Sequence, residues 1–329
     1  MQAVWFEKNG PAAEVLQFGE RPTPIPGPGE VRVRVAVSGV NPSDVKRRMG
    51  SPTQKLAFPW AIPNNDGAGV IDAVGQGVDA SRVGERVWLH STGWMRPLGT
   101  AAEYTVTPSA RAFRLPDVTS FEVGAGLGVP AMTAHRAVFG CGSVTGKTVL
   151  VTGGAGAVGF YAIQLARRGG ARVIATVSGA DKAAEARRAG AHEVVNYKSE
   201  DVVARVKALT GEAGVDHIVE VDFGANLKAS VALLKDSGSL ATYASMAAPE
   251  PAIPFYPMMF KNLQVLWVFV YEMPQSAMEA AARDIHDWLM SGTAQHPRYH
   301  HFRFDQAAGA HQAVEAAVTG KVLIDIASL

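Results

Sequence analysis

A glycine-rich turn between an apolar strand and a helix constrains this chain more than any other feature. Residues 149–159 read Val-Leu-Val-Thr-Gly-Gly-Ala-Gly-Ala-Val-Gly, so a β-branched run stops at glycines and a helical pattern begins at once. Gly154, Gly156 and Gly159 match the pattern G-x-G-x-x-G in full. In this pattern the first glycine permits a tight turn, the second lets the backbone approach a pyrophosphate, and the third lets the helix pack closely on the strand.

The residues after the turn provide the context that the motif requires. Apolar residues recur with helical spacing at Val158, Tyr161, Ala162, Leu165 and Ala166. A second apolar run at 173–177 follows, so the segment is predicted to be a strand-helix-strand unit with parallel strands. Backbone N–H groups at the start of the helix, at Ala157 and Val158, then face the phosphates, where the helix dipole favours negative charge. We therefore predict that this segment binds a dinucleotide.

The whole chain is long enough for two domains and carries almost no net charge. It has 329 residues, of which 47% are hydrophobic and 19% charged, and its formal net charge is +1. This balance gives no indication of a nucleic-acid partner or of binding to an anionic membrane. The single cysteine, Cys141, excludes an internal disulfide and fits a reducing compartment. The start of the chain has no secretory apolar segment, and the longest apolar run, 265–271, is too short to cross a bilayer, so we expect a cytoplasmic protein.

The pattern of the chain changes near residue 121. Before it, Val31, Val33, Val35 and Val37 alternate with Arg or Ala, which predicts a half-buried strand. Further short strands between Gly- and Pro-rich turns are predicted at 69–74, 86–90 and 103–106. This pattern is typical of a compact β-barrel.

After residue 121, alanine-rich helices alternate with short apolar strands. Strands are predicted at 194–197, 215–221, 239–244 and 263–271, with helices at 181–189, 200–209 and 227–234. This alternation is typical of a doubly wound parallel sheet. The tail is predicted to contain a helix at 275–290, a histidine-rich turn at 296–301, a helix at 307–318, and a strand at 322–326 that rejoins the first domain.

A series of motifs carries a family resemblance. They are Gly39-Val40-Asn41-Pro42-Ser43-Asp44 with Arg48 and Gly50, Asp66-Gly67-Ala68-Gly69-Val70-Ile71, Gly128-Val129-Pro130-Ala131-Met132-Thr133-Ala134, the glycine-rich turn, Ala189-Gly190-Ala191 with Val195-Asn196-Tyr197, and Gly214-Val215-Asp216. In order and spacing they resemble the medium-chain dehydrogenase/reductase superfamily, in particular its zinc-free quinone oxidoreductase branch, the zeta-crystallin-like proteins. The resemblance covers essentially the whole chain. It implies an α/β protein with a GroES-like β-barrel catalytic domain at 1–123, to which 272–329 return, and an NADPH-binding Rossmann domain at 124–271.

Two positions depart from the pattern of this family. Members usually carry Pro-Gly shortly before the aspartate of the second motif, whereas this chain has Asn64-Asn65-Asp66. The Tyr or Trp expected after Thr133-Ala134 is His135. We therefore expect a substrate pocket that differs from that of the best-known members.

A zinc site is not expected. With Cys141 as the only thiol, sites of the Cys₄ or Cys₂His type are impossible. His296, His300 and His301 cluster in the sequence, but cations flank them, and a surface turn is the favoured interpretation over a metal site.

The end of the second Rossmann strand indicates which nicotinamide cofactor binds. NAD selectivity usually comes from an acid there, and this chain has Ser178-Gly179 instead. Asp181 follows, but Ser178-x-x-Asp181 is predicted to be a capping box. In the family, Ser178, Lys182 and Tyr197 match positions that hold the NADPH 2′-phosphate. The alternative for Lys182 is a solvated helix face; we predict NADPH.

The resemblance also implies which residues surround the nicotinamide. They are Asn41 and Thr133 beside the ring, Ser245 and Met246 after the strand at 239–244, and Phe269, Val270 and Tyr271 on the far side. The cofactor supplies the hydride chemistry, so the protein contributes orientation and electrostatics.

No side chain stands out as a catalytic acid. Asp44 is either a pocket acid or the N-cap of a short helix before Gly50. His135 and Tyr271 are candidates to donate a proton to a reduced carbonyl oxygen, and the alternative for each is a packed aromatic or surface role.

The sequence is therefore interpreted as that of an NADPH-dependent, zinc-independent reductase that delivers hydride to a quinone or a related activated carbonyl or alkene. The alternative within the same branch is an enone, alkenal or enoyl-thioester reductase. An alternative of another class is a sensor or structural protein that binds NADPH without turnover.

The strand predicted at Leu263–Tyr271 also suggests a quaternary state. It is almost wholly apolar and contains no charged residue, so an exposed edge there would invite aggregation unless covered. Two copies pairing across a two-fold axis would satisfy this edge, and the resemblance supports such a homodimer. The alternative is a strand buried within one subunit by the tail helices.

Overall fold

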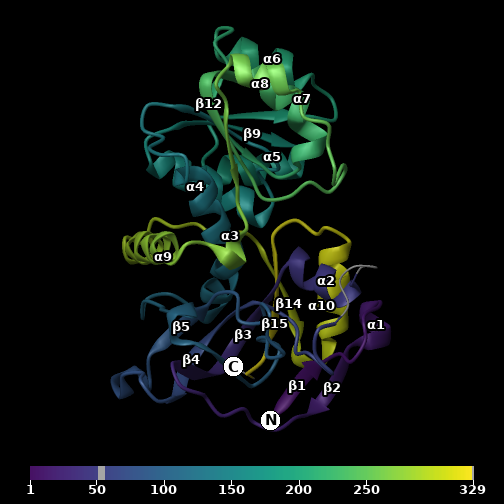
Figure 1. The fold of residues 1–329 in the computed structure, drawn as a ribbon, viewed down its shortest axis with the longest axis vertical. Helices are drawn as coiled ribbons and strands as arrows, with labels where there is room; N and C mark the ends of the chain where they lie inside the picture. The colour runs from purple at the N-terminus through teal and green to yellow at the C-terminus, as the bar shows by residue number, and fades with distance from the viewer. Residues whose placement is uncertain (51–55, 328–329) are drawn as a thin grey trace. The chain divides into compact units, whose positions relative to one another are not determined.

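The computed structural model describes residues 1–50 and 56–327, and the chain divides into two compact units. The first unit contains Met1–Val129, Ala282–Thr293 and Arg298–Leu329, and the second contains Pro130–Ala281 and Ala294–Pro297. In Figure 1 the yellow C-terminal segment can be followed back to the purple and blue strands of the first unit. Within the described residues, no helix combines the length and apolar character that crossing a membrane requires.

The first unit is built on a mixed sheet with the order β14-β15-β3-β4-β5-β7, and β6 pairs with β3. Its strands are β3 (Glu30–Val40), β4 (Asp66–Val74), β5 (Arg86–Leu89), β6 (Tyr104–Pro108), β7 (Ala112–Arg114), β14 (Tyr299–Arg303) and β15 (Lys321–Asp325). A separate ribbon pairs β1 (Gln2–Trp5) with β2 (Gln17–Glu20). The predicted alternation along β3 is confirmed, because all four valines at 31, 33, 35 and 37 are buried.

The C-terminal segment completes this unit. β15 runs antiparallel to β3, with Val322 opposite Val40, so the predicted return of the last strand is confirmed. Helix α10 (Ala307–Glu315) contributes Ala307 and Ala310 to a core that also contains Val322 and Ile324 of β15. Helices α1 (Ala12–Val15) and α2 (Pro42–Met49) also belong to this unit.

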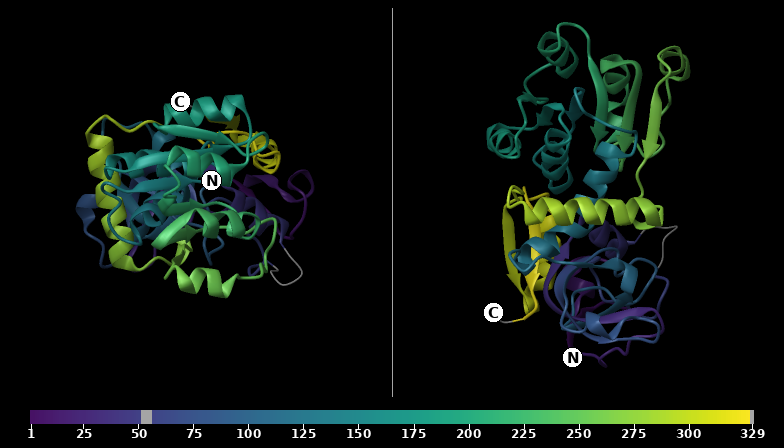
Figure 2. Two further views of the ribbon diagram at one scale, coloured as in Figure 1. Left: turned by 90° about the horizontal axis from the view of Figure 1, so that it is seen from above. Right: turned by 90° about the vertical axis from the view of Figure 1, so that its left-hand side faces the viewer.

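The second unit contains the predicted doubly wound sheet. All its strand pairs are parallel, in the order β10-β9-β8-β11-β12-β13. The strands are β8 (Thr148–Val151), β9 (Arg172–Val177), β10 (Glu193–Asn196), β11 (Val215–Glu220), β12 (Leu234–Thr242) and β13 (Gln264–Trp267). The connecting helices are α4 (Ala157–Arg168), α5 (Ala180–Arg188), α6 (Val202–Leu209), α7 (Phe223–Leu233) and α8 (Phe255–Phe260). Figure 2 shows these teal and green helices lying over the strands.

Two long helices contain the boundaries between the units. Helix α3 (Phe121–Phe139) contains Pro130, the first residue of the second unit. Helix α9 (Gln275–Met290) has the limits that the sequence predicted, and the first unit resumes within it at Ala282.

Two predicted elements of the tail are wrong. The strand predicted at 263–271 is shorter: β13 ends at Trp267, the Val268 N–H still donates to the Thr242 carbonyl, and the chain then forms a 3₁₀ turn at Val270–Glu272. The predicted histidine-rich turn is in part strand β14, which lies parallel to β15. The histidines favour the strand because His300 bonds the Thr319 carbonyl and His301 bonds Asp325.

The unusual residue Asn64 occupies a backbone conformation that glycine normally adopts. Its φ is +75°, and asparagine tolerates this region better than most residues. The Asn64 side chain donates to the Ser38 hydroxyl at 3.0 Å and accepts a hydrogen bond from His311 Nε2 at 3.1 Å. Burial, with Arg48 nearby, lowers the pKa of His311 to about 3, so the neutral ring is the donor. Asn64 thus replaces glycine at the turn and satisfies two buried groups.

Substitutions at Asn64 separate the two roles. Asn64→Gly keeps the positive φ and loses both side-chain bonds, whereas Asn64→Ala loses the bonds and strains the backbone. We expect Asn64→Ala to lower the free energy of unfolding by roughly 1 kcal/mol more than Asn64→Gly does. Urea unfolding of the two variants measures the difference, and equal losses would show that the backbone conformation contributes nothing.

Candidate functional site

The glycine-rich turn joins β8 to α4 in the second unit. The φ of Gly153 is +64°, so this residue makes the sharp turn, and the prediction that Gly154 does so is wrong by one position. A Cβ on Gly154 would lie 2.8 Å from the Ala175 Cβ, and one on Gly159 would lie 2.3 Å from the Gly153 carbonyl oxygen. These two glycines therefore permit close packing between the turn, the sheet and α4.

The outer side of the same turn fits a pyrophosphate. Among the described residues, the nearest atom to a Cβ built on Gly156 is the Gly153 carbonyl oxygen at 3.4 Å, so the backbone is open to a ligand there. Gly156 is the N-cap of α4, and Ala157 and Val158 follow it in the first turn. The first N–H groups of a helix have no carbonyl partner within it. The turn therefore offers N–H donors to an anion at the positive end of the helix dipole.

Ser178 and Tyr197 leave the sheet at neighbouring places. Val177 ends β9 and pairs with Asn196, which ends β10, so the next residue of each strand lies at the same carboxyl edge. Lys182 is half-buried in the first turn of α5. Ser178 and Tyr197 thus follow neighbouring strand ends, and Lys182 lies in the helix that follows the first of them.

The predicted capping box at the start of α5 is wrong. Gly179, in an extended conformation, is the N-cap, and α5 begins at Ala180 without a side-chain cap. Ser178 lies one residue too early to cap the helix, and Asp181 is exposed. The structural role assigned to Asp181 is therefore absent, and the Ser178 hydroxyl is not used as a cap.

The loops after β12 and β13 carry the next group of predicted residues. Thr242 pairs with Trp267, so both loops start at the same edge of the sheet. The Ser245 hydroxyl donates to the Ala248 carbonyl and accepts the Gly224 N–H, and it thereby fixes its loop. Met246 and Phe269 are exposed, whereas Val270 is buried.

The remaining predicted residues of the second unit lie in packed surroundings. Thr133 is buried in α3. The ring of His135 lies 4.9 Å from that of Phe139, and the ring of Tyr271 lies 5.4 Å from that of Phe269.

In the first unit, Asn41 and Asp44 belong to one buried cluster. Asn41 is the N-cap of α2, and Asp44 is the third helical residue, so the alternative that Asp44 is the N-cap is wrong. One Asp44 carboxylate oxygen accepts the Asn41 N–H at 2.8 Å, and the other accepts the Asn65 amide at 2.6 Å. Burial, with Asp66 nearby, raises the pKa of Asp44 to about 6.

Sequence reasoning missed two charged members of this cluster. Asp66 and Lys321 are both buried, and the Lys321 ammonium lies 3.0 Å from an Asp66 oxygen and 2.6 Å from Asn41 Oδ1. Asp66 was used only as part of a family motif, and the predicted last strand began one residue after Lys321. A lysine followed by the apolar run Val322-Leu323-Ile324 was the available signal, because a charge at the start of a buried strand needs a partner.

The three clustered histidines do not converge. His296 belongs to the second unit, where its ring bonds the Tyr161 hydroxyl at 3.2 Å, and burial lowers its pKa to about 4. His300 and His301 lie on β14 of the first unit with partners of their own. Across residues 1–50 and 56–327, no three His, Cys, Asp or Glu side chains are grouped as a metal site would require.

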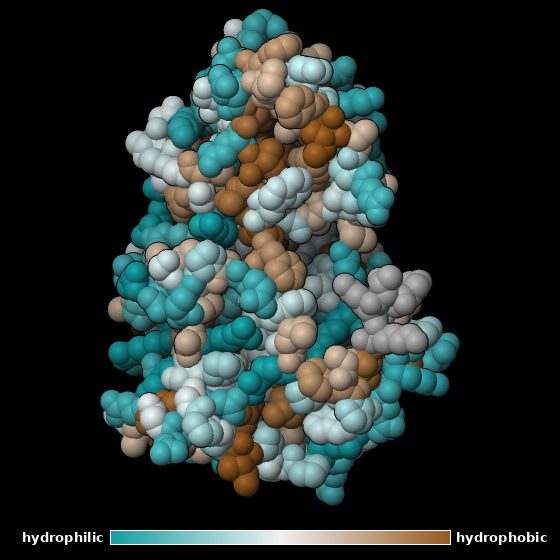
Figure 3. Space-filling model, viewed as in Figure 1, coloured by the Kyte–Doolittle hydropathy of each residue, from teal (hydrophilic) through white to brown (hydrophobic). Residues whose placement is uncertain are grey.

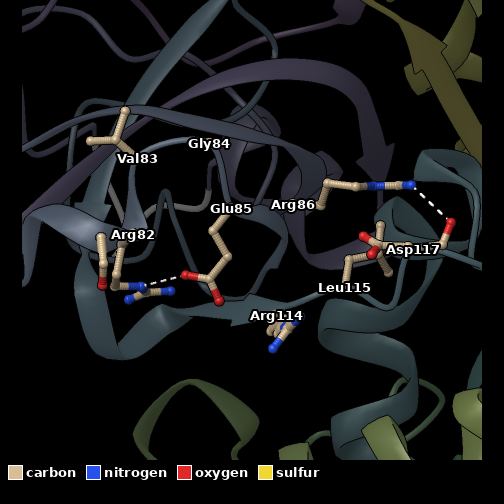
Figure 4. A pocket seen from close by; sticks show the side chains of 9 residues that line it. Arg82, Val83, Gly84, Glu85, Arg86, Arg114, Leu115 and Asp117 are labelled. Carbon is tan, nitrogen blue, oxygen red and sulfur yellow. Dashed lines mark hydrogen bonds and ion pairs between the residues drawn. The ribbon is translucent and has the colours of Figure 1, made fainter.

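An open depression on the first unit is lined by several charged side chains, and two of its arginines bond neighbouring groups (Figure 4). The Arg82 guanidinium bonds Glu85 and the carbonyls of Ser109 and Ala112. The Arg86 guanidinium bonds the carbonyls of Asp117 and Thr119. These arginines support the barrel and do not form an anion site.

Two family models and several full-length relatives match the chain. The model "Alcohol dehydrogenase GroES-like domain" matches residues 27–117, and "Zinc-binding dehydrogenase" matches 157–287. The quinone oxidoreductase of Homo sapiens is 30% identical over 97% of this chain and 95% of its own length. A 2-haloacrylate reductase of Burkholderia sp. is 30% identical over 95% and 94%.

Solved structures agree with these relatives. The Escherichia coli quinone oxidoreductase complexed with NADPH has a TM-score of 0.86 and 26% identity, and the match covers 99% of this chain and 100% of the other. The chain therefore belongs to the quinone oxidoreductase branch of the medium-chain dehydrogenase/reductase superfamily.

Proposed function

We propose that this protein is an NADPH-dependent reductase that delivers hydride to a quinone or a related activated carbonyl or alkene. The observation that carries the proposal is the glycine-rich turn of the second unit, whose geometry fits a pyrophosphate, in a chain similar over its full length to quinone oxidoreductases. One such relative was solved with NADPH. When bound, NADPH supplies the hydride from its nicotinamide ring.

The chain's own residues bind and orient this cofactor. In the turn, Gly156, Ala157 and Val158 receive the pyrophosphate, and Gly154 and Gly159 let the turn pack closely enough to do so. Ser178, Lys182 and Tyr197 are proposed to receive the 2′-phosphate, which the backbone supports because Ser178 and Tyr197 follow paired strand ends and Lys182 is in the first turn of the next helix. Around the nicotinamide we propose Asn41, Thr133, Ser245, Met246, Phe269 and Val270.

The proton that follows hydride addition needs a donor. Both oxygens of Asp44 accept N–H bonds, which suits a carboxylate, and with a pKa of about 6 this group is ionised at pH 7. We therefore propose His135 or Tyr271 as the donor to a reduced carbonyl oxygen.

A second candidate is the reduction of an activated alkene. The relative named 2-haloacrylate reductase, which is also 30% identical to this chain, favours it. The departure at His135, two residues after Thr133, is consistent with a pocket adapted to another acceptor.

Zinc independence and a cytoplasmic location belong to the same proposal. The chain has one thiol, which rules out a Cys₂His set, and the buried oxygens of Asn41 and Asp66 already bind the Lys321 ammonium. A single cysteine suits the reducing cytoplasm.

We also propose a homodimer that forms through β13. This strand is the outermost of the described sheet, so its edge can pair with another copy. Close to it in sequence, α8 exposes Phe255, Tyr256, Met259 and Phe260, and Trp267 of β13 is also exposed. Figure 3 shows brown apolar residues gathered on the visible face of this unit.

The cofactor preference is tested at Lys182. Lys182→Ala removes the cation proposed for the 2′-phosphate, so NADPH binding should weaken by ~1.5–3 kcal/mol while NADH binding stays nearly unchanged. Fluorescence titration measures both, with Lys207→Ala in the last turn of α6 as the control. Wild-type protein that binds NADH as tightly as NADPH would contradict the assignment.

The reaction is tested by stopped-flow oxidation of bound NADPH. We expect turnover with 1,4-naphthoquinone, and the alkene candidate predicts turnover with 2-chloroacrylate, 2-cyclohexenone or crotonyl-CoA. Protein dialysed against a chelator should retain full activity. If no acceptor oxidises the bound NADPH, the alternative of a sensor or structural protein without turnover is favoured. Activity that requires added zinc would contradict zinc independence.

The dimer is tested by placing a charge on the apolar surface. Phe260 is 73% exposed, so Phe260→Glu should leave the folded unit intact and produce monomers in light scattering at micromolar concentration. Ile25 is 85% exposed in the first unit, and Ile25→Glu is the matched control. Wild-type protein that is monomeric at this concentration would exclude the dimer.

A further inference from the structure

The buried ammonium of Lys321 is the least expected charge in the first unit. Its side chain is 2% exposed and that of Asp66 is fully buried. A buried lysine is costly unless its charge is paired and its protons are hydrogen-bonded. Here it donates to Asp66 Oδ2 and to Asn41 Oδ1.

The fold makes space for this pair. A Cβ on Gly39 would lie 3.0 Å from the Lys321 Cε, and one on Gly128 would lie 2.1 Å from Asp66 Oδ1. The Val129 N–H donates to the same Asp66 oxygen at 2.7 Å. The pair is thus supported from β3 and α3 as well as from its own strands.

The two charges fix the orientation of the Asn41 amide. An ammonium can only donate, so Lys321 must face the amide oxygen. A carboxylate can only accept, and Asp66 accepts from Asn41 Nδ2 at 2.7 Å. Rotating the amide by 180° would turn both contacts into repulsions.

We propose that Lys321 is a positioning residue of the reductase, which locks the Asn41 side chain and balances the negative charges of Asp44 and Asp66. The inference rests on the proposed function, in which Asn41 lies beside the nicotinamide. The last strand of the chain thereby sets the geometry of a residue near its start.

The charged groups around Asp44 determine how its pKa changes when Lys321 is removed. Asp66 from β4 raises the Asp44 pKa, while Lys321 from β15 and the bond from Asn65 lower it. On α2 itself, Arg47 donates to the Gly93 and Arg96 carbonyls, and Arg48 pairs with Glu315. Without the ammonium, the Asp44 pKa rises, so the carboxylate gains its proton at a higher pH.

The experiment compares Lys321→Met with Lys321→Arg. For each variant we measure the pH profile of kcat/KM with 1,4-naphthoquinone, the KM for NADPH and the melting temperature. Lys321→Met should lower kcat about ten- to a hundredfold through misplacement of Asn41, with little change in KM. The Asp44 carboxylate accepts the Asn41 N–H, so its protonation loosens the same residue and produces the acidic limb. Lys321→Met should raise the pH of that limb by about one unit, whereas Lys321→Arg, which keeps the charge, leaves it in place. The control Lys235→Met breaks a lysine–aspartate pair of the second unit and should change neither.

Loss of folding is addressed by a second variant. Lys321→Met/Asp66→Asn removes both charges of the pair with little change in size, so neither member of the pair is left buried without the other. We expect it to fold and still to lose kcat. Wild-type kcat in this double variant, or wild-type kcat with an unmoved acidic limb in folded Lys321→Met, would overturn the inference.

A measurement that needs no turnover tests the role of Lys321 independently of the proposed function. Carbon-13 NMR of the Asp44 carboxyl follows its titration in the protein alone. A midpoint about one pH unit higher in Lys321→Met supports the role of Lys321 even if no acceptor is reduced. The same midpoint in both proteins would overturn it even if quinones are reduced.

Discussion

The buried ion pair between Lys321 and Asp66 is the interaction on which the first unit most depends. It joins the last strand of the chain to β4, and through Asn41 it holds the start of α2. Removing one charge from such a pair leaves the other buried and unpaired, which costs several kcal/mol, of the order of ~3–5. The barrel therefore requires the C-terminal segment, whose strand β15 returns to pair with β3.

The second unit depends on a different constraint, the close approach of the glycine-rich turn to the sheet and to helix α4. Gly153 adopts a positive φ, and Gly154 and Gly159 leave no space for a side chain. The helix N-terminus can then lie against the end of β8 with its N–H groups directed outward. Steric packing, rather than charge, gives this unit an anion site.

Hydrophobic periodicity in the sequence predicted helices and strands reliably. The valines of β3 and the full extent of α9 were predicted because burial on one face has a fixed repeat. Local hydrogen-bond chemistry was less reliable. The capping box predicted at Ser178 is wrong because Gly179 is the N-cap of α5. The turn predicted at 296–301 is in part strand β14, whose His300 bonds the Thr319 carbonyl, a contact that spacing along the chain does not reveal.

The Asn41–Asp66–Lys321 cluster could not be predicted from spacing, because Asn41 and Lys321 are separated by most of the chain and meet only through strand pairing. The candidate cofactor residues come from the family resemblance, and the parallel topology adds only that Ser178 and Tyr197 follow neighbouring strand ends. The most direct test of the proposed cofactor site is a crystal structure of the complex with NADPH. It should show the 2′-phosphate bonded to Ser178 and Lys182 and the nicotinamide beside Asn41. A 2′-phosphate that contacts neither residue, or a nicotinamide away from Asn41, would contradict it.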